Sequence, residues 1–437
     1  MKPPQIKRAQ SQPAIGLTLV GIALILSVAA AWRPDLRGIA VTVIFVGSYA
    51  ALAIGRIPGL SIDRAGIALA GAGLTITAGA LPLDEAYRAI DLDTLALLLG
   101  MMIIAASLRL SGFFAFASRW IADHAGTPTI LLVGVVATSG LFSAFLVNDA
   151  VCLVLAPLVL GLTRAMGRNP VPYLLAVAMA SNVGSAATIT GNPQNIMIGS
   201  LSRIPYASFA GALCPAALAG LVVSAAAIWL LHPGEFAGHV QLTPATAESR
   251  VNRVLVIRAL VATAAVIMLF FAGMAPAKAA IIIAGLLLLT RRLKSRRIYA
   301  EIDWTLLLMF AGLFVIVAGA ERTLLTPAII ADVGRLDLDR VPILTGVTAV
   351  LSNLVSNVPA VLVIKPFVGA LADPDRAWLV ISMAATFAGN FTVLGSIANL
   401  IVVQKAAEGG VVIDFWAYFR VGAPLTVITL VIGALWL

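Results

Sequence analysis

The sequence predicts an all-α polytopic membrane protein with about 11 transmembrane helices and two re-entrant helical hairpins, arranged in two inverted repeats. Three observations predict this fold class: the composition, the long uncharged runs, and a series of motifs that occurs twice. Of the 437 residues, 61% are apolar and 11% are charged, whereas soluble domains contain about 25% charged residues. So few charges cannot cover a soluble surface of this size, and a soluble fold is excluded.

The apolar runs predict the spans and two longer stretches. Each of the longer stretches, 127–166 and 341–371, has a polar break at its centre, Val147-Asn148-Asp149 in one and Ser356-Asn357-Val358-Pro359 in the other. A stretch of this length can form two full spans or a hairpin that enters and leaves on one side. The spans are expected at 14–32, 38–55, 65–80, 94–111, 171–200, 208–231, 254–273, 276–290, 304–320, 377–404 and 412–437.

The basic residues indicate the orientation and argue against nucleic-acid binding. The net charge of +9 comes from Lys and Arg in short loops between apolar runs, as membrane topology requires. With the N-terminus in the cytoplasm, about twice as many basic residues fall on the cytoplasmic side as on the other. The stretch 291–297 is the strongest of these signals. We therefore expect a multi-pass protein of the bacterial inner membrane, with the lipid bilayer as its partner and no nucleic acid.

Three blocks of sequence occur twice in the same order. Four complete spans separate the first block from its partner, plus one long stretch that adds zero or two crossings, so the partners run in opposite directions. Inverted repeats of this kind form many secondary transporters. The blocks are 93–98 with 304–309, Ser143, Asn148 and Pro157 with Ser352, Asn357 and Pro366, and Met179, Thr188, Gly191 and Asn195 with Met383, Thr392, Gly395 and Asn399.

The repeat predicts the organisation of the chain. We expect an N-terminal anchor helix in 1–37, a first half at 38–232, a cytoplasmic linker at 233–253 and a second half at 254–437. Residues 171–200 and 377–404 carry Gly, Asn and other polar residues within apolar runs, with a Pro in the first of them, so we expect a broken helix in each half. Backbone unwound at membrane depth must be satisfied by protein, water or ligand.

The polar residues at these breaks are the candidate binding site. Their amides and hydroxyls can coordinate a cation or donate to an anion, and helix N-termini present positive dipole ends to an anionic solute. Packing of small residues, with amides linking the helices, is the structural alternative. The candidate residues are Asn148, Asp149, Ser181, Asn182, Thr188, Thr190, Gly191, Asn192, Asn195, Ser356, Asn357, Pro359, Thr392, Gly395, Ser396 and Asn399.

Asp149 is the candidate proton-coupling residue. A carboxylate near the bilayer midplane is costly and indicates function. Burial favours the neutral form of a carboxyl group, so Asp149 can hold a proton in one conformation and release it in another. Alternatively, it stays ionised and helps to bind a cation, or it forms a permanent ion pair with Lys365, the candidate charge partner. Lys365 could instead face an anionic substrate or extend to the interface.

These motifs resemble those of the ion transporter superfamily, which includes the arsenite permease ArsB, citrate carriers of the CitM type, NhaD sodium/proton antiporters and divalent anion/sodium symporters. The resemblance covers about residues 40–437 and rests on 145–150, the Gly-Asn-Pro-Gln-Asn loop at 191–195, 356–359 and 395–399. Dicarboxylate symporters carry Ser-Asn-Thr at both hairpin tips, whereas the tips of this chain look more like the ArsB/CitM branch. The resemblance also implies two re-entrant hairpins and a homodimer.

We therefore expect a secondary carrier, and not an enzyme, for a small anion or oxyanion-type solute. Proton-coupled efflux of arsenite or antimonite is the leading expectation. The alternatives are a sodium-coupled di- or tricarboxylate symporter similar to citrate carriers, or a sodium/proton antiporter; a channel and a membrane enzyme are remote alternatives. No His lies in a predicted span and the chain has no ATP-binding loop, so we expect no cofactor apart from H⁺ or Na⁺ as coupling ion.

Overall fold

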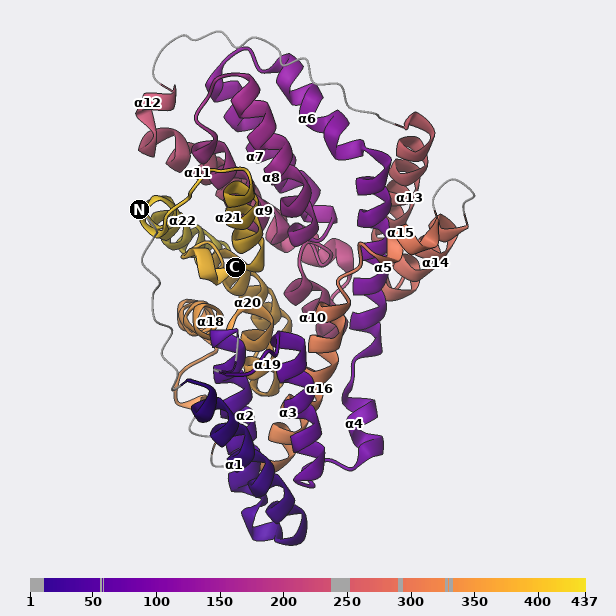
Figure 1. The fold of residues 1–437 in the computed structure, drawn as a ribbon, viewed down its shortest axis with the longest axis vertical. Coiled ribbons are helices and arrows are strands. Elements are labelled where there is room, and N and C mark those ends of the chain that lie inside the picture. Colours follow the sequence, from indigo (N-terminus) through magenta and orange to yellow (C-terminus); the bar gives the residue numbers. More distant parts are fainter. Residues whose placement is uncertain are drawn as a thin grey trace, which may run out of the picture. The chain divides into compact units, whose positions relative to one another are not determined.

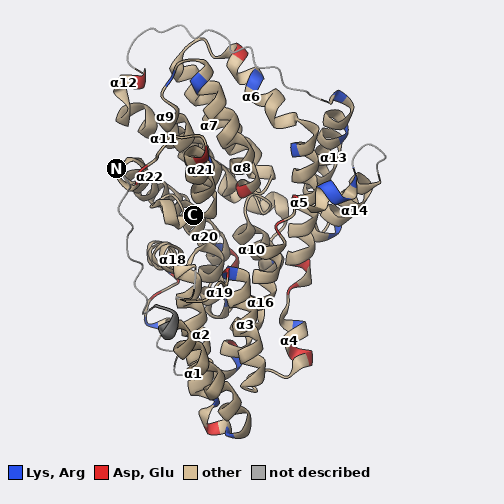
Figure 2. Ribbon diagram, in the orientation of Figure 1, with Lys and Arg blue, Asp and Glu red and all other residues tan. Residues whose placement is uncertain are grey.

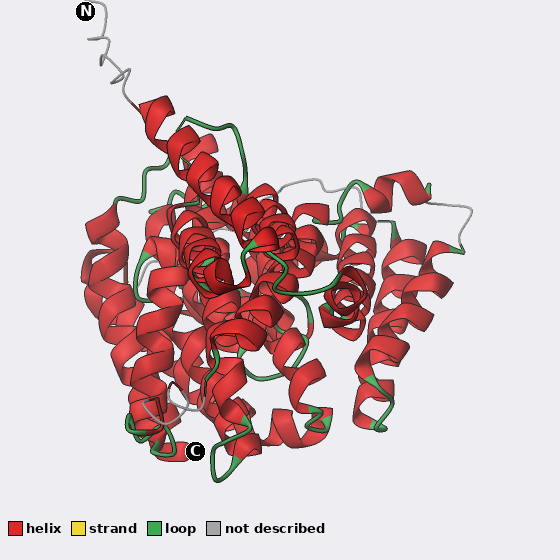
Figure 3. Ribbon diagram, turned by 90° about the horizontal axis from the view of Figure 1, so that it is seen from below, coloured by secondary structure: helices red, strands yellow, loops and turns green. Residues whose placement is uncertain are grey.

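The computed structural model describes residues 12–236 without Arg56 and Pro58, then 252–289, 294–326, 329 and 333–437. Every regular element within these residues is a helix (Figure 3), so the predicted all-α fold is confirmed. Eight of the described helices are long and apolar enough to cross a membrane. Residues 291–293 of the predicted basic stretch and 237–251 of the predicted linker lie outside the described residues.

The chain divides into two compact units, and each unit contains helices from both halves of the repeat. The first unit comprises Met1–Asp91 and Trp304–Gly334. In it, α16 packs against α3 and α2, so a helix of the second half lies among helices of the first. Its main helices are α1 (Gln12–Trp32), η1 (Pro34–Leu36), α2 (Arg37–Ile54), α3 (Arg64–Thr77), α4 (Leu83–Ala89) and α16 (Trp304–Leu324).

The second unit comprises Leu92–Asp303 and Arg335–Leu437, and its α-helices are labelled in Figure 1. They are α5 (Leu92–Ser111), α6 (Phe113–His124), α7 (Pro128–Phe145), α8 (Asn148–Ala165), α9 (Pro170–Ser185), α10 (Pro193–Ser202), α11 (Tyr206–Leu231), α12 (Pro233–Phe236), α13 (Arg253–Phe271), α14 (Pro276–Leu288), α15 (Ser295–Tyr299), α18 (Val341–Val355), α19 (Asn357–Val368), α20 (Pro374–Ala388), η2 (Val393–Gly395), α21 (Ile397–Glu408) and α22 (Phe415–Trp436).

The two long stretches each form two helices joined by a short break. The break between α7 and α8 is Leu146 and Val147, and the break between α18 and α19 is Ser356. The helices of each pair pack against one another. The two predicted broken helices are also observed, as α9 with α10 and as α20 with α21. The series α7 to α11 therefore has the same order of elements as the series α18 to α22.

An Asn-Pro or Asp-Pro pair begins three of these helices. Asn169, Asn192 and Asp373 are the N-caps of α9, α10 and α20, and each side chain accepts a hydrogen bond from a backbone N–H of the first turn. The proline that follows has no N–H to satisfy, and its fixed φ suits the first helical position. The sequence therefore sets where these helices restart after each break.

The two halves also exchange helix partners. A Cβ at Gly100 in α5 would lie 2.8 Å from the carbonyl carbon of Ala280 in α14, and a Cβ at Gly312 in α16 would lie 2.6 Å from that of Ala68 in α3. The same offset of 212 relates 68 to 280 and 100 to 312. Each long helix thus packs closely against the small-residue helix of the other half. The predicted boundaries of the repeat halves remain predictions, because each compact unit combines helices of both halves and does not mark where a half begins or ends.

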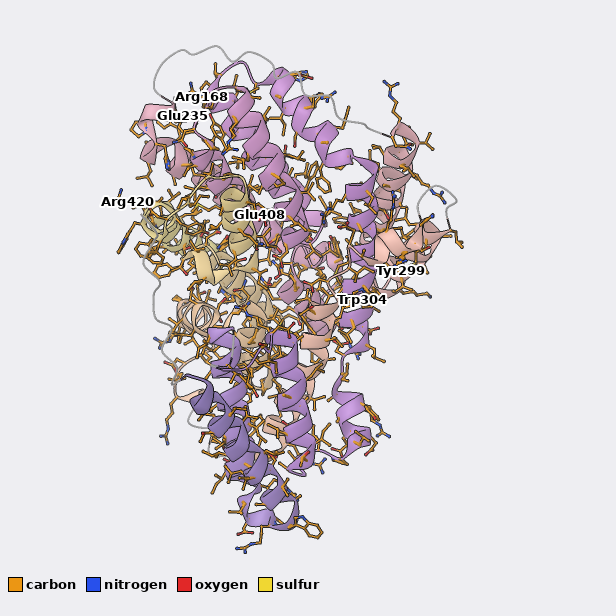
Figure 4. The ribbon with its side chains drawn as sticks, in the orientation of Figure 1. Arg168, Glu235, Tyr299, Trp304, Glu408 and Arg420 are labelled. Carbon is orange, nitrogen blue, oxygen red and sulfur yellow. The ribbon has the colours of Figure 1, made fainter. Side chains whose placement is uncertain are left out.

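The predicted linker begins with α12, which is bound to the start of α9. Glu235 Oε1 accepts hydrogen bonds from Arg168 Nε at 2.7 Å and from the Tyr173 hydroxyl at 2.9 Å. Figure 4 shows Arg168 and Glu235 beside each other next to α12. The hydrogen bond from Arg168 to Glu235 raises the pKa of the guanidinium above its usual value.

Candidate functional site

The breaks in the second unit bring the polar residues of both halves together. The helix starts of α8, α10 and α21 meet the ends of α9 and α20 through hydrogen bonds between amide and hydroxyl side chains. Neither α9 nor α10 contains a charged residue (Figure 2). The centre of this unit is therefore built almost entirely from neutral donors and acceptors.

Asn182, near the end of α9, joins the two halves. Its Nδ2 donates to Oδ1 of Asn390 at 2.8 Å and to Oδ1 of Asn399 at 2.9 Å. Its Oδ1 accepts from Nδ2 of Asn148 at 2.9 Å and from Oγ of Ser396 at 3.0 Å. An amide side chain has two hydrogens to donate and two lone pairs, so Asn182, which is 2% exposed, is fully satisfied inside the protein.

Asn195 and Asn399 hold the two broken segments in the same way. Nδ2 of Asn195 donates to the backbone carbonyls ten and seven residues earlier, at 3.2 and 3.0 Å. Nδ2 of Asn399 donates to the carbonyls ten and seven residues earlier, at 2.7 and 3.2 Å. The repeat offset of 204 therefore relates both donors and all four acceptors. The four carbonyls belong to Ser185, Thr188, Gly389 and Thr392.

Hydroxyl groups anchor the first broken segment to neighbouring helices. Thr188 donates to the carbonyl of Ala144 at the end of α7. Thr190 Oγ1 lies 3.3 Å from Thr188 Oγ1 and 2.9 Å from the hydroxyl of Tyr206 in α11. The predicted site residues Thr188 and Thr190 are thus both buried and part of a continuous hydrogen-bonded chain.

Gly191 and Asn192 explain the tight path of this segment. A Cβ at position 191 would overlap the carbonyl of Ser185, so only glycine allows the approach. Asn192 Nδ2 donates to Oγ of Ser185 at 2.9 Å and to Oγ1 of Thr386 in α20 at 3.2 Å. The backbone N–H of Asn148 donates to the carbonyl of Gly191 at 2.9 Å, which fixes the first hairpin tip to the broken segment.

The second hairpin tip has a strained backbone, and a hydrogen bond between the two helices of the same hairpin, α18 and α19, holds it. Ser356 has φ 76° and ψ 159°, a conformation that is essentially restricted to glycine. Ser352 donates to Oδ1 of Asn357 at 2.6 Å and to the carbonyl of Ala385 at 3.1 Å. Pro359 is buried in the first turn of α19. Among the described residues, Asn357 makes no hydrogen bond to the Asn182 network.

Asp149 lies in the first turn of α8, next to Asn148 of the network. It is half-buried and makes no hydrogen bond or ion pair with any residue that the structure describes. Lys365 lies in the last turn of α19 and does not pair with Asp149. The alternative of a permanent Asp149–Lys365 ion pair is therefore not observed.

The remaining candidates and several unexpected residues complete the network. Ser181 Oγ lies 2.9 Å from the thiol of Cys152, and Gly395 lies where a Cβ would be 2.8 Å from the carbonyl of Gly389. Sequence reasoning did not select Thr386 as a site residue, although 386 and 182 are related by the repeat offset of 204. The other unselected members of the network are Gln194, Ser382 and Asn390.

Comparison with known proteins identifies the family. Residues 49–380 match the family model described as citrate transporter. The chain belongs to the citrate transporter family. This family member is 32% identical to an uncharacterised transporter of Mycobacterium tuberculosis over 91% of this chain and 97% of that protein. It is 30% identical to the silicon efflux transporter LSI3 of Oryza sativa subsp. japonica, over 86% of this chain and 93% of that protein.

The fold of this citrate transporter family member also matches a solved structure. The crystal structure of the Alcanivorax borkumensis YdaH transporter has a TM-score of 0.57 at 14% sequence identity, and the match covers 92% of this chain and 97% of that one. The predicted resemblance and the assignment as a multi-pass membrane transporter of small solutes, and not an enzyme, are confirmed.

Proposed function

We propose that this chain is a secondary carrier that exports a small oxyanion-type solute in exchange for protons, with arsenite and antimonite as the first candidates. The observation that supports it is the buried network at the breaks, in which amides and hydroxyls of both halves meet beside the carboxyl group of Asp149. Residence in the bacterial inner membrane with a cytoplasmic N-terminus, and assembly as a homodimer, belong to the same proposal.

The chemistry of the network favours a small hydroxylated solute. Asn, Ser and Thr side chains both donate and accept hydrogen bonds, as the hydroxyl groups of arsenous and antimonous acid do. A tricarboxylate such as citrate would instead require compensating positive charge, and no Lys or Arg belongs to the network described above. The silicon efflux transporter LSI3 supports this choice, because silicon also dissolves as a small hydroxylated acid.

The position of Asp149 supports proton coupling. Its carboxylate is adjacent to Asn148, whose side chain is bonded to Asn182 at the crossing of the two halves. The Asn148 carbonyl oxygen Oδ1 is buried without a partner among the described residues, so one acceptor at this helix start is available to a ligand. A solute or a proton bound here would contact the residues that join the halves.

The test is flux through the purified chain in proteoliposomes under an imposed proton or sodium gradient. Arsenite, antimonite, citrate, a dicarboxylate and sodium are compared at two pH values. We expect arsenite or antimonite flux that follows the proton gradient in the wild type. Asp149→Asn should lose gradient-driven accumulation, while Asp123→Asn, at an exposed position in α6, should keep it. Proton coupling that is unchanged in Asp149→Asn, or sodium-driven citrate uptake without metalloid flux, would refute the proposal.

A further inference from the structure

A cavity of about 380 Å³ lies in the second unit at the ends of α5, α10, α11, α13 and α14. Among the residues that line it are Arg203, Tyr206, Phe270 and Met274. Neither Asn182 nor any of the four residues that hydrogen-bond to its side chain lines this cavity. Its volume falls within the range of pockets that bind small organic molecules, and it exceeds what a single hydroxylated metalloid would fill.

Arg203 gives the cavity its positive charge. It follows α10 in the left-handed conformation, with φ 56° and ψ 18°, where glycine or asparagine is the usual residue. Its guanidinium makes no hydrogen bond or ion pair with a described residue. An arginine therefore occupies a position where the backbone conformation favours glycine, and its exposed side chain is available to an anionic group.

Two aromatic rings form an apolar wall of the same cavity. The rings of Tyr206 and Phe270 stack with their centroids 4.9 Å apart and their planes at 27°. Met274 and Leu97 extend this apolar surface. An occupant that matches the cavity has an apolar or aromatic body and one anionic end. Asp93 also lines the cavity, but it already takes part in an interaction of its own.

Tyr206 belongs both to the cavity and to the hydrogen-bonded chain of the central segment. Its ring lines the cavity, whereas its hydroxyl lies 2.9 Å from Thr190 Oγ1, which is 3.3 Å from Thr188 Oγ1. The residue is 3% exposed. A molecule packed against the ring would therefore restrain the side chain that contacts the segment 186–192.

We infer that this cavity is a second binding site, separate from the central network, for an organic monocarboxylate with an aromatic or apolar body. Arg203 binds the carboxylate, Phe270 and Tyr206 pack against the body, and Tyr206 transmits occupancy to the segment 186–192. The site accepts an organic anion whatever the transported solute is.

The test measures binding to the full chain in lipid nanodiscs by fluorine NMR, with para-trifluoromethylbenzoate as the acidic probe and para-trifluoromethylbenzylamine as the basic one. We expect saturable binding of the acid, about tenfold tighter than that of the amine. Arg203→Gln should weaken the acid about tenfold and leave the amine unchanged, and Phe270→Ala should weaken both. Arg340→Gln, at an exposed ion pair with Asp337, is the matched control and should change neither.

Two further measurements distinguish a loss of binding from a folding defect. Arg203→Gly relieves the left-handed conformation, so its melting temperature should be unchanged or higher, while the acid should bind about tenfold more weakly, as it does in Arg203→Gln. Hydrogen exchange in 186–192 should slow when the acid binds to the wild type, and Tyr206→Phe should bind the acid without this slowing. The inference would be overturned if Arg203→Gln bound the acid as tightly as the wild type, or if the wild type bound the amine more tightly than the acid. It would also be overturned if lipid displaced the probe equally well with and without Arg203, or if acid binding left hydrogen exchange in 186–192 of the wild type unchanged.

Discussion

Asn182 has its amide hydrogens and lone pairs committed to four side chains from three other segments of the second unit. Removing it leaves buried amides of Asn148, Asn390 and Asn399 without one of their partners. Hydrogen bonds between membrane helices contribute on average about 0.6 kcal/mol each, and a buried polar group left unsatisfied costs about 1–3 kcal/mol.

We therefore expect Asn182→Ala to lower the free energy of unfolding by about 2 kcal/mol. The measurement is the melting temperature of the purified protein in detergent. Gln404→Ala removes an amide that is exposed and bonded only to Glu408, so it serves as the control and should melt as the wild type does. Equal melting of the two variants would show that the network does not stabilise this conformation.

At the strained hairpin tip, a substitution of Ser356 is expected to raise the stability and not to lower it. Glycine adopts φ 76° without the steric cost that a Cβ imposes, so Ser356→Gly should raise the stability by about 1 kcal/mol. The equivalent position in the first half is Val147, with φ −57°, and Val147→Gly should destabilise. Thermal unfolding of both variants checks this pair. A lower melting temperature for Ser356→Gly would mean that the hydroxyl contributes more than the strain costs.

At the residue scale, the types of polar residue were predictable from the sequence, but their pairing was not. The repeat offset of 204 relates Asn195 to Asn399 by sequence alone, and both bind equivalent carbonyls. The bond from Asn182 to Asn390 crosses 208 residues, and no local pattern indicates such a partner. Asn357 shows the converse, because its repeat position matches Asn148 although it has no bond to the same network among the described residues.

Among the elements, α12 shows how an ion pair outside the spans can fix a connection. Glu235 and Arg168 have side chains that are 9% and 15% exposed, so their pairing is little screened by water. Removing one charge leaves the other partly buried and unpaired.

Glu235→Gln should therefore reduce the free energy of unfolding by about 1–3 kcal/mol. Asp35→Asn breaks the pair between Arg33 and Asp35, whose side chains are 69% and 63% exposed, and should change stability by less than about 1 kcal/mol. Melting temperatures of the two variants, measured side by side, test the contrast. Similar losses in both would show that burial does not decide the strength of these pairs.

The positions of the helix breaks were predictable because the signals are local. A cap residue followed by proline marks a helix start within a few residues, and polar residues in an apolar run mark the break before it. The interruption at Ser356 was predicted in the same way, but its unusual φ was not, since serine carries no signal for that region. The number of full-length spans was harder to predict, because the predicted spans 65–80 and 276–290 form helices of only 14 and 13 residues.

At the scale of the whole molecule, the close contacts of Gly100 and Gly312 allow a test of the packing between helices of different repeat halves. Gly100→Ala and Gly312→Ala each place a Cβ against the backbone of a neighbouring helix, so each should cost about 1–3 kcal/mol. The double variant should lose roughly the sum, because the two glycines lie in different compact units and contact different helices. Gly285→Ala in α14, where a Cβ would meet nothing within 4 Å, is the control and should leave the melting temperature unchanged or higher.

The contacts of Gly100 and Gly312 also set the order in which the chain can be assembled. When a ribosome has made only the first half, α3 and α5 are already in the membrane, but α16 and α14, on which they pack, do not yet exist. Lipid or the insertion machinery must cover these helices until the second half arrives. The first half therefore cannot reach its final packing during its own synthesis, and its maturation waits for α14 and α16.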